Sequence, residues 1–379
     1  MLHSMKIHVW VPDYASAIGG IQTFSRFIVR ALRDVFPESE IAVFSKNDTS
    51  YPDPAFDPAD SFKPMGWWTP KLRTPEFAWQ LFQSGAWHRP DFIITTHVNF
   101  APVARWLQKL FSIPYVAVGH GVEVWEIRNK PVRQALRAAN LLLAVSEFTR
   151  QRIATTLGLD AKRIALLPDT FDPEQFYPGR KPHYLLKRYG LAADQPVILT
   201  IARLASAERY KGYDQVLHAL PLVRERFPDV RYVLGGRGRD RPRVEALIRE
   251  LGVGANVTLA GYVPDHELRS HYNLCDVFAM PSKGEGFGIV FLEALGCGKP
   301  VLAGNKDGSV DAVLNGALGK LVDPDNLTEI ASALIATLDR KHSNGTTSDA
   351  DALRSRAIDA YGYDRFRDRL GEVLKLFLK

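Results

Sequence analysis

Short apolar runs alternate with amphipathic segments along most of the chain. In the first half the runs are KIHVWVP, EIAVFSK, DFIITTHV, PYVAVGH, LLLAVSE and RIALLP. In the second half they are VILTIARL, VRYVLGG, NVTLAGYV, DVFAMPS, PVLAGN and GKLVDP. Continuous apolar strands separated by helical segments are typical of parallel sheets that are covered on both faces. The pattern therefore predicts an α/β protein with two doubly wound, Rossmann-like series.

The two series are separated by residues 168–196, which contain five prolines and no sustained apolar run. We interpret this segment as an interdomain linker. With 379 residues the chain is long for a single core, so two domains are expected. We place the first domain at residues 1–175 and the second at residues 185–360.

Two regions depart from the alternating pattern. Residues 47–90 are rich in proline and aromatic residues, and we expect them to be the least regular part of the chain. Their tryptophans either form an acceptor or membrane-surface patch with nearby lysines or cover the core; they are Trp67, Trp68, Trp79 and Trp87. The following segment APVARWLQKLF is predicted to be a helix. The segment KHSNGTTSDADA is predicted to be a polar loop.

Composition narrows the class of protein. With 46% hydrophobic and 24% charged residues, and no apolar run of the roughly 18 residues that span a bilayer, we expect a cytoplasmic protein. Cys275 and Cys297 match no metal spacing and are predicted to be core residues. The net charge of +6 suits an acidic ligand, but its even spread argues against nucleic acid. The densest basic cluster, residues 237–243, is predicted to be a solvated loop.

The stretch FAMPSKGEGFGIVFLEALGCGKP, residues 278–300, carries the candidate chemistry. It reads as a strand, a glycine-rich turn and a helix that resumes near Gly288. Glu285 lies in the turn and Glu293 in the second helical turn. If all eight steps were helical, the two would be roughly 12 Å apart along the axis, whereas a sugar-cleaving pair stands about 5 to 9.5 Å apart. We therefore expect them to hold opposite ends of one long ligand.

Three other places combine suitable residues with a suitable position. Gly19 and Gly20 lie between the first strand and a helix predicted from about Ile21 to Phe36, where bare backbone can approach a phosphate. His120 ends the strand PYVAVGH, at the strand edge where ligands bind. Arg203 and Lys211 flank the loop after VILTIARL, where a guanidinium and an ammonium could neutralise a diphosphate.

The run Gly284-Glu285-Gly286-Phe287-Gly288 followed by Glu293 resembles the paired-glutamate signature of glycosyltransferase family 4. Members of that family are retaining, sugar-nucleotide-dependent enzymes of the GT-B fold, with two Rossmann-like domains that face a central cleft. The resemblance implies that Glu285 contacts the donor sugar and that Glu293 binds the nucleotide ribose. It also implies that the amides of Gly286, Phe287 and Gly288 hold the sugar hydroxyls.

The same resemblance implies roles elsewhere in the chain. Gly19 and Gly20 would touch the donor diphosphate, and Arg203 and Lys211 would form its cationic clamp. His120 would lie beside the transferred sugar, with His97 a weaker candidate, and the backbone at Tyr262 and Val263 would face the base. The final helix, residues 363–379, would return to the first domain. The family's asparagine-glycine pair is replaced here by Asp169 and Thr170.

The expected function is retaining transfer of a hexose from UDP-glucose or GDP-mannose to a glycan or lipid-linked oligosaccharide, in cell-surface or exopolysaccharide synthesis. No side chain stands out as a nucleophile, so we expect direct front-face transfer without a metal or cofactor. The acidic pairs Asp323/Asp325 and Asp349/Asp351 are expected to lie away from the cleft. Weak association with anionic membranes is also expected.

Three alternatives remain. A silent sugar-nucleotide-binding protein would need only the cleft, and a glycogen-type glucan synthase would use a different acceptor. A cofactor-dependent oxidoreductase would need a GxGxxG motif, which the chain lacks.

Overall fold

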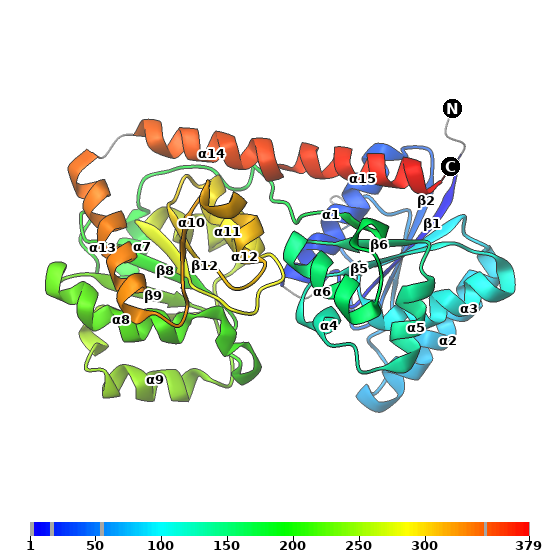
Figure 1. Ribbon diagram of the computed structural model, residues 1–379, viewed down its shortest axis with the longest axis horizontal. Coiled ribbons are helices and arrows are strands. Elements are labelled where there is room, and N and C mark those ends of the chain that lie inside the picture. Colours follow the sequence, from blue (N-terminus) through cyan, green and yellow to red (C-terminus); the bar gives the residue numbers. More distant parts are fainter. Residues whose placement is uncertain (1–3, 16–18, 54–56, 345–346, 379) are drawn as a thin grey trace. The chain divides into compact units, whose positions relative to one another are not determined.

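The computed structural model describes residues 4–15, 19–53, 57–344 and 347–378. The chain divides into two compact units, Phe171–Gly362 and the remainder, which comprises Met1–Thr170 and Tyr363–Lys379 (Figure 1). Each unit contains one parallel sheet with helices on both faces. The predicted α/β architecture with two doubly wound series is therefore confirmed.

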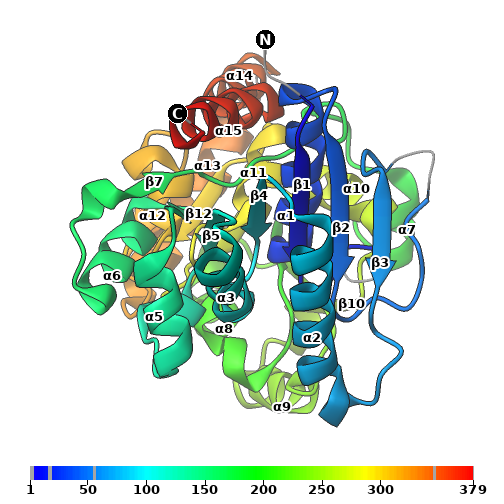
Figure 2. The same ribbon diagram turned by 90° about the vertical axis from the view of Figure 1, so that its right-hand side faces the viewer.

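The first unit is built on a seven-stranded sheet with the order β3-β2-β1-β4-β5-β6-β7 (Figure 2). Its strands are β1 (Lys6–Val11), β2 (Glu40–Ser45), β3 (Ser61–Pro64), β4 (Phe92–Thr95), β5 (Tyr115–Gly119), β6 (Leu141–Ala144) and β7 (Ile164–Leu166). All neighbours pair in parallel, and β1 aligns Val9 with Val43 of β2 and with Ile94 of β4. The central strands β1, β4 and β5 are apolar and largely buried because helices cover both faces of the sheet, whereas the edge strand β3 is partly exposed.

The helices of the first unit are α1 (Gly20–Val35), α2 (Pro70–His88), α3 (Ala101–Phe111), α4 (Val122–Trp125), α5 (Lys130–Ala138) and α6 (Glu147–Leu157), with the short turns η1 (Val98–Phe100) and η2 (Ala161–Arg163). The last helix, α15 (Tyr363–Phe377), packs against α1 within this unit. The Phe24 and Phe366 rings meet edge to face at 5.6 Å, and the Tyr363 hydroxyl donates to Asp34. The chain's final helix thus belongs to the first unit.

The second unit has a six-stranded parallel sheet with the order β10-β9-β8-β11-β12-β13. The strands are β8 (Val197–Ile201), β9 (Arg231–Gly235), β10 (Val257–Gly261), β11 (Val277–Met280), β12 (Val301–Gly304) and β13 (Lys320–Val322). The helices are α7 (His183–Tyr189), α8 (Tyr213–Arg226), α9 (Arg241–Glu250), α10 (Asp265–Leu274), α11 (Ile289–Gly296), α12 (Ser309–Ala312), α13 (Leu327–Asn344) and α14 (Thr347–Tyr361). The 3₁₀ turns are η3 (Ser206–Lys211), η4 (Gly254–Asn256) and η5 (Leu314–Gly316).

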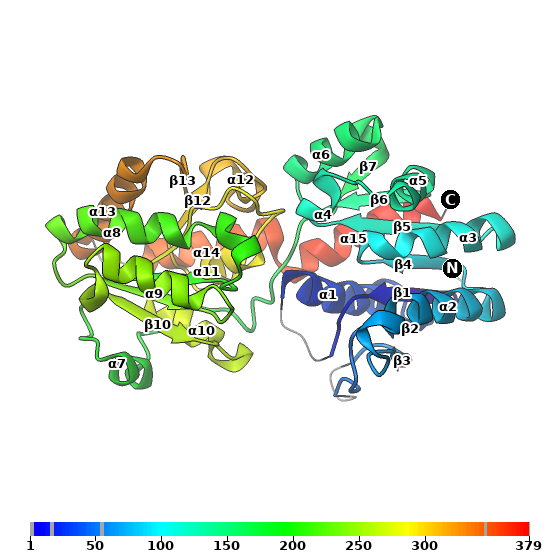
Figure 3. The same ribbon diagram turned by 90° about the horizontal axis from the view of Figure 1, so that it is seen from below.

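Helices α8, α9 and α13 lie on one side of this sheet (Figure 3). They share one apolar core with its strands. Leu217 of α8, Val244 of α9 and Leu334 of α13 are fully buried in it. On the other face α11 packs against α10, α12 and α14. The loops that follow the strands therefore lie at one edge of a rigid, doubly covered sheet.

The strand, loop and helix predicted for residues 278–300 are present as β11, a glycine-rich loop and α11. Gly288 precedes the helix with a φ of 101°, and Gly298 follows it with a φ of 67°. Both values lie in the left-handed region that favours glycine. The two glycines therefore explain where the helix begins and ends.

Three sequence predictions of irregular structure are wrong. Residues 70–88 form the long helix α2, although Pro75 lies inside it and its tryptophans point outward. The basic cluster is only partly loop, because α9 begins at Arg241 and includes Arg243. The polar segment 341–352 belongs to α13 and α14 wherever the structure describes it, so Asp349 and Asp351 lie on a helix.

Cys275 and Cys297 are both buried, as predicted for core residues. Within the described ranges, no helix has the length and apolarity needed to cross a membrane.

Candidate active site

Most of the candidate residues of the second unit lie at the carboxyl edge of its sheet. Arg203 follows β8, and Lys211 ends η3, just before α8. Tyr262 and Val263 follow β10, and Glu285 lies in the loop between β11 and α11. Because all strands are parallel, these loops leave the same edge of the sheet, where open α/β sheets bind their ligands.

Lys211 and Glu285 form an ion pair between two of these loops. Their side chains are only 16% and 12% exposed, so the pair is largely shielded from water. The loops are also joined through the backbone, since the amide of Lys283 donates to the carbonyl of Tyr210 at 2.9 Å. A Cβ at Gly212, which has a φ of 83°, would come within 2.3 Å of the Pro281 oxygen. Only glycine permits this close approach.

The cationic clamp expected from the sequence is already occupied by carboxylates. Arg203 pairs with Glu208 at 2.7 Å, and Glu208 lies 4.0 Å from Lys211. Burial alone lowers the pKa of Lys211, but Glu285 raises it, and the resulting pKa lies above the usual value. Lys211 therefore stays protonated. An anionic ligand would gain these two cations by exchanging with Glu208 and Glu285 rather than by filling an unpaired site.

A buried carboxylate that the sequence analysis missed shapes the glycine-rich loop. Asp307 accepts hydrogen bonds from the Glu285 amide at 2.7 Å and from the Ser282 hydroxyl at 2.8 Å. The Phe287 side chain is 2% exposed and packs edge to face on Tyr361 at 5.3 Å. Since the Phe287 side chain is used for anchoring, Phe287 can offer a ligand only its backbone. Gly286 and Gly288, which have no side chains, share this limit.

Glu293 is buried between α11 and α10. The Tyr272 hydroxyl donates to its Oε2 atom at 2.6 Å, and the residue is 9% exposed. Burial raises the pKa of Glu293 to about 7, although the bond from Tyr272 acts in the opposite direction. Glu293 is thus largely buried, and Tyr272 already engages one of its two carboxylate oxygens.

The raised pKa gives a stability prediction. The folded protein favours the protonated carboxyl of Glu293, so the protonated form stabilises the fold. This stabilisation is complete below pH 4.5 and is lost as the pH rises through about 7. Glu293→Gln mimics the protonated form. We expect the variant and the wild type to have the same melting temperature at about pH 5. At about pH 8 the variant should melt several degrees higher. Equal melting temperatures at both pH values would contradict the burial argument.

Tyr262 and Val263 differ in what they can present to a ligand. Val263 is 6% exposed, so only its backbone is accessible. The Tyr262 ring is 45% exposed, and the Arg237 guanidinium lies over it at 4.7 Å from the ring centre. A half-exposed aromatic ring with a guanidinium over it can contact a nucleotide base.

The candidates of the first unit lie at the carboxyl ends of β1 and β5. Gly19 immediately precedes α1 and Gly20 begins it, with an extended φ of 170° at Gly19. His120 directly follows β5, and its ring meets Phe24 of α1 edge to face at 4.8 Å. The structure therefore brings His120 close to α1, which Gly19 and Gly20 introduce.

The protonation of His120 can be derived from its contacts. Its Nε2 atom lies 2.9 Å from the Thr96 carbonyl, which can only accept, so Nε2 carries the proton. Burial lowers the pKa of His120 to about 4, against the effect of that hydrogen bond. The imidazole is therefore neutral at physiological pH, with Nδ1 as an acceptor. The weaker candidate His97 accepts from the Asn99 amide at 3.2 Å, so its Nδ1 is already used.

The acidic pair Asp323/Asp325 lies nearer to the Glu285 loop than expected. Lys283, two residues before Glu285, pairs with Asp325 at 2.6 Å, and Lys306 pairs with both aspartates. A hydrogen bond from Lys306 lowers the pKa of Asp323, and hydrogen bonds from Lys283 and Lys306 lower that of Asp325. In the part of the chain that the structure describes, no group of three metal-ligating side chains is present.

Comparison with known proteins relates both units to one family. The family described as "Glycosyltransferase Family 4" matches residues 18–175, and "Glycosyl transferases group 1" matches residues 185–354. The sucrose-phosphate synthase structure from Thermosynechococcus elongatus superposes with a TM-score of 0.81 over 98% of each chain, at 21% identity. That likeness concerns the fold.

Several relatives, including the following two, are mannosyltransferases by name. The GDP-mannose-dependent alpha-(1-6)-phosphatidylinositol monomannoside mannosyltransferase of Mycolicibacterium smegmatis is 34% identical over 274 residues, which are 68% of this chain and 69% of that protein. The GDP-mannose-dependent monoacylated alpha-(1-6)-phosphatidylinositol monomannoside mannosyltransferase of Corynebacterium glutamicum is 28% identical over 96% of this chain and 93% of its own length. Together with the family matches on both units, these findings show that the chain belongs to the family 4, group 1 glycosyltransferases and has their GT-B fold.

Proposed function

We propose that this glycosyltransferase moves mannose from GDP-mannose to a sugar or polyol on a lipid-linked acceptor, with retention of the anomeric configuration. The observation that carries the proposal is the Lys211–Glu285 pair at the carboxyl edge of the second sheet. A cation for a diphosphate and a carboxylate for a sugar lie side by side there, in a chain several of whose relatives are named for GDP-mannose. These names favour GDP-mannose over UDP-glucose.

We assign the charge stabilisation of the departing diphosphate to Lys211 and Arg203. Once the donor has displaced their carboxylate partners, the largely shielded Lys211 ammonium and the more exposed Arg203 guanidinium can stabilise the developing negative charge. Glu285 then accepts from the donor sugar once Lys211 turns toward the phosphate, and Glu293 accepts from the ribose. The amides of Gly286, Phe287 and Gly288 would hold sugar hydroxyls, and neutral His120 would accept through Nδ1. With no assigned nucleophile, the acceptor hydroxyl attacks from the face that the diphosphate leaves.

The proposal is tested by a donor and acceptor panel. Purified protein would be incubated with GDP-mannose, UDP-glucose or GDP-glucose, each with phosphatidylinositol mannoside or with a polyprenyl-linked oligosaccharide of the kind used in exopolysaccharide synthesis. We expect mannosyl transfer from GDP-mannose and an α-linked product by NMR. A β-linked product would refute retention, and binding of GDP-mannose without transfer to either acceptor would indicate a silent sugar-nucleotide-binding protein.

Transfer is expected to be independent of divalent metal. Two cations are available to the diphosphate, while the Asp323/Asp325 pair is held by two lysines. Activity in excess EDTA should stay within about twofold of the untreated rate. Loss of transfer in EDTA that manganese or magnesium restores would show that a metal carries this charge instead.

The first unit has a surface suited to an anionic membrane. Trp67, Trp68, Trp79 and Trp87 are 71, 44, 54 and 86% exposed, so the interpretation that these tryptophans cover the core is wrong, and the nearby Trp106 is 61% exposed. They lie on or beside α2 and α3, which pack together and also carry Lys71, Arg73, Arg105 and Lys109. Tryptophan with lysine and arginine is typical of interfacial binding. We propose weak, peripheral association through this surface.

Replacing both Trp67 and Trp68 with serine is expected to reduce sedimentation with anionic liposomes severalfold, because each indole contributes apolar area at the interface. Binding of the wild type should also weaken as salt is raised. Tyr184→Ser is a matched control, since this 44% exposed aromatic residue lies in the second unit. An equal reduction in the control, or none in the double variant, would remove this surface from the proposal.

A further inference from the structure

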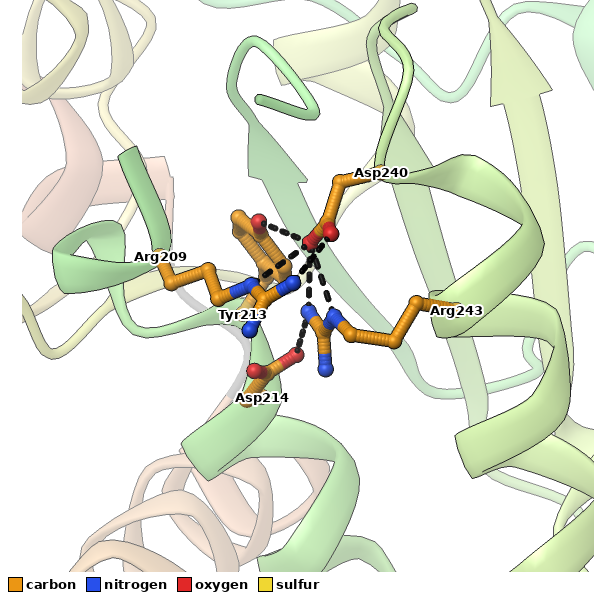
Figure 4. Close-up of polar contacts among 5 residues, drawn as sticks. All are labelled: Arg209, Tyr213, Asp214, Asp240 and Arg243. Atoms are coloured by element: carbon orange, nitrogen blue, oxygen red, sulfur yellow. Dashed lines mark hydrogen bonds and ion pairs between the residues drawn. The ribbon is translucent and has the colours of Figure 1, made fainter. Parts of the chain in front are cut away.

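A buried carboxylate, Asp240, connects three elements of the second unit (Figure 4). It directly precedes α9 and follows the turn after β9. Its side chain is 4% exposed and lies between the side chains of Arg209, Arg243 and Tyr213. Arg209 belongs to η3, and Tyr213 begins α8. None of these four residues was singled out as part of the site from the sequence.

The contacts show that Asp240 is fully engaged. Arg209 donates from Nε at 3.1 Å and from Nη2 at 2.7 Å. Arg243 donates from Nε at 2.9 Å and from Nη2 at 2.6 Å, and its Nη2 also reaches Asp214 at 2.9 Å. The Tyr213 hydroxyl donates at 3.1 Å. Two guanidinium forks on one shielded carboxylate give strong, directional bonds.

The electrostatics agree with this geometry. Hydrogen bonds from Arg243 hold the pKa of Asp240 far below its usual range, against the opposing effect of burial, and Arg209 acts in the same direction. Asp240 is therefore ionised at any pH at which the protein would be assayed. A neutral side chain at this position would remove the negative charge that the two guanidinium groups share.

The segment that Asp240 holds is the one that carries the proposed diphosphate clamp. Arg209 lies two residues before Lys211, and Tyr213 lies two residues after it. The backbone adds further links, because the Asp240 amide donates to the Leu204 carbonyl at 3.0 Å and Leu204 donates to the Arg237 carbonyl at 3.1 Å. The opposite side of the same segment is joined to the Glu285 loop through Tyr210 and Lys283.

We infer that Asp240 is a positioning residue, which through Arg209 and Tyr213 holds residues 203–213 so that Lys211 and Arg203 can meet a nucleoside diphosphate. The inference rests on the proposed function, since it requires these two cations to act on the donor diphosphate. Arg209 is an anchor and not a third phosphate ligand, because Asp240 occupies its Nε and Nη2. The position of the positively charged loop thus depends on the buried negative charge of Asp240.

The chain provides a matched control in Asp276. Its side chain is 3% exposed and accepts from Lys181 at 2.8 Å and from the Val197 amide at 2.8 Å. It lies at the amino ends of β8 and β11, the edge of the same sheet opposite to the clamp. Asp276→Asn and Asp240→Asn therefore remove similar buried charges from one unit, but only Asp240 adjoins the clamp.

The test compares the affinities of these variants for GDP and for guanosine, which has no phosphate. Both variants should melt at lower temperature than the wild type. Only Asp240→Asn should lose GDP affinity, by about tenfold or more, with guanosine affinity unchanged. Unchanged GDP affinity in Asp240→Asn would overturn the inference, as would an equal loss in Asp276→Asn or a parallel loss of guanosine binding.

A second variant keeps the test decisive if Asp240→Asn does not fold. Arg209→Ala removes a 47% exposed side chain and leaves Asp240 paired with Arg243. It should show the same selective loss of GDP affinity, with partial recovery in Arg209→Lys, and unchanged GDP affinity in Arg209→Ala would overturn the inference. If the wild type binds no GDP, the proposed function fails and the inference fails with it. Wild-type binding with unaffected variants would refute the inference alone.

Discussion

Lys211→Met is expected to lower the turnover number for mannosyl transfer by about 100- to 1,000-fold, the usual effect of removing one group that stabilises developing charge. The side chain is 16% exposed and bonded to Glu285, so no mobile surface cation can take its place at that point. Arg203 is 70% exposed and pairs with Glu208, so it offers weaker compensation. The loss should appear chiefly in the turnover number because charge on the diphosphate grows as the bond to the sugar breaks.

The matched control is Lys283→Met. Lys283 lies in the same loop as Glu285, but its side chain is 43% exposed and pairs with Asp325. Removing this lysine changes the net charge equally and should leave the turnover number within about threefold of the wild type. Similar losses in both variants would show that overall charge matters and not the placement of Lys211. Full activity in Lys211→Met would exclude the proposed clamp.

Changing each glutamate to glutamine is expected to affect a different kinetic constant. Glu293→Gln should mainly raise the Michaelis constant for GDP-mannose, because a ribose contact is equally strong in the ground and transition states. Glu285→Gln should mainly lower the turnover number, because its contact strengthens as positive charge develops on the sugar ring. A charged hydrogen bond is worth about 1.5 to 3 kcal/mol, or roughly ten- to 150-fold in the affected constant.

The structure adds a condition to this division of roles. The pKa of Glu293 is raised to about 7, so wild-type Glu293 is largely charged only above that pH. The kinetic gap between the wild type and Glu293→Gln should therefore widen from about pH 6 to about pH 8. Steady-state kinetics at both pH values would check this, and a gap that does not change with pH would exclude the Glu293 carboxylate as the titrating group.

The arrangement around Glu285 could be predicted because its determinants are local. An apolar run, a glycine-rich turn and an apolar helix follow one another in residues 278–300, and β11 and α11 appear where that pattern placed them. The glycines at 288 and 298 have the positive φ values that such boundaries require. Local patterning determines local structure when burial and backbone preference agree.

The supports of the site could not be predicted, because they are long-range. Asp240 and Arg209 are 31 residues apart, Asp307 and Glu285 are 22 apart, and Tyr272 and Glu293 are 21 apart. No periodicity relates such partners, and only the strand order brings them together. The pairing of the clamp with carboxylates could not be predicted for the same reason, since Glu208 and Glu285 reach their cations only in the folded unit.

Helix α2 was missed for a different physical reason. The usual sign of a surface helix is a polar outer face, but Trp79 and Trp87 are exposed on α2 and hide its amphipathic pattern. Pro75 also suggests an end where the helix continues. The exposed tryptophans that obscure the helix pattern are also the residues that we propose to contact a membrane surface.

The central claim is that the second unit binds the donor nucleotide with these two glutamates in separate roles. It is tested by calorimetric titration of GDP into the wild type, Glu285→Gln and Glu293→Gln at about pH 8. The expected result is GDP binding by the wild type, nearly unchanged affinity in Glu285→Gln, and affinity weakened by roughly ten- to 150-fold in Glu293→Gln. Equal affinities in all three proteins, or equal losses in the two variants, would contradict the assignment.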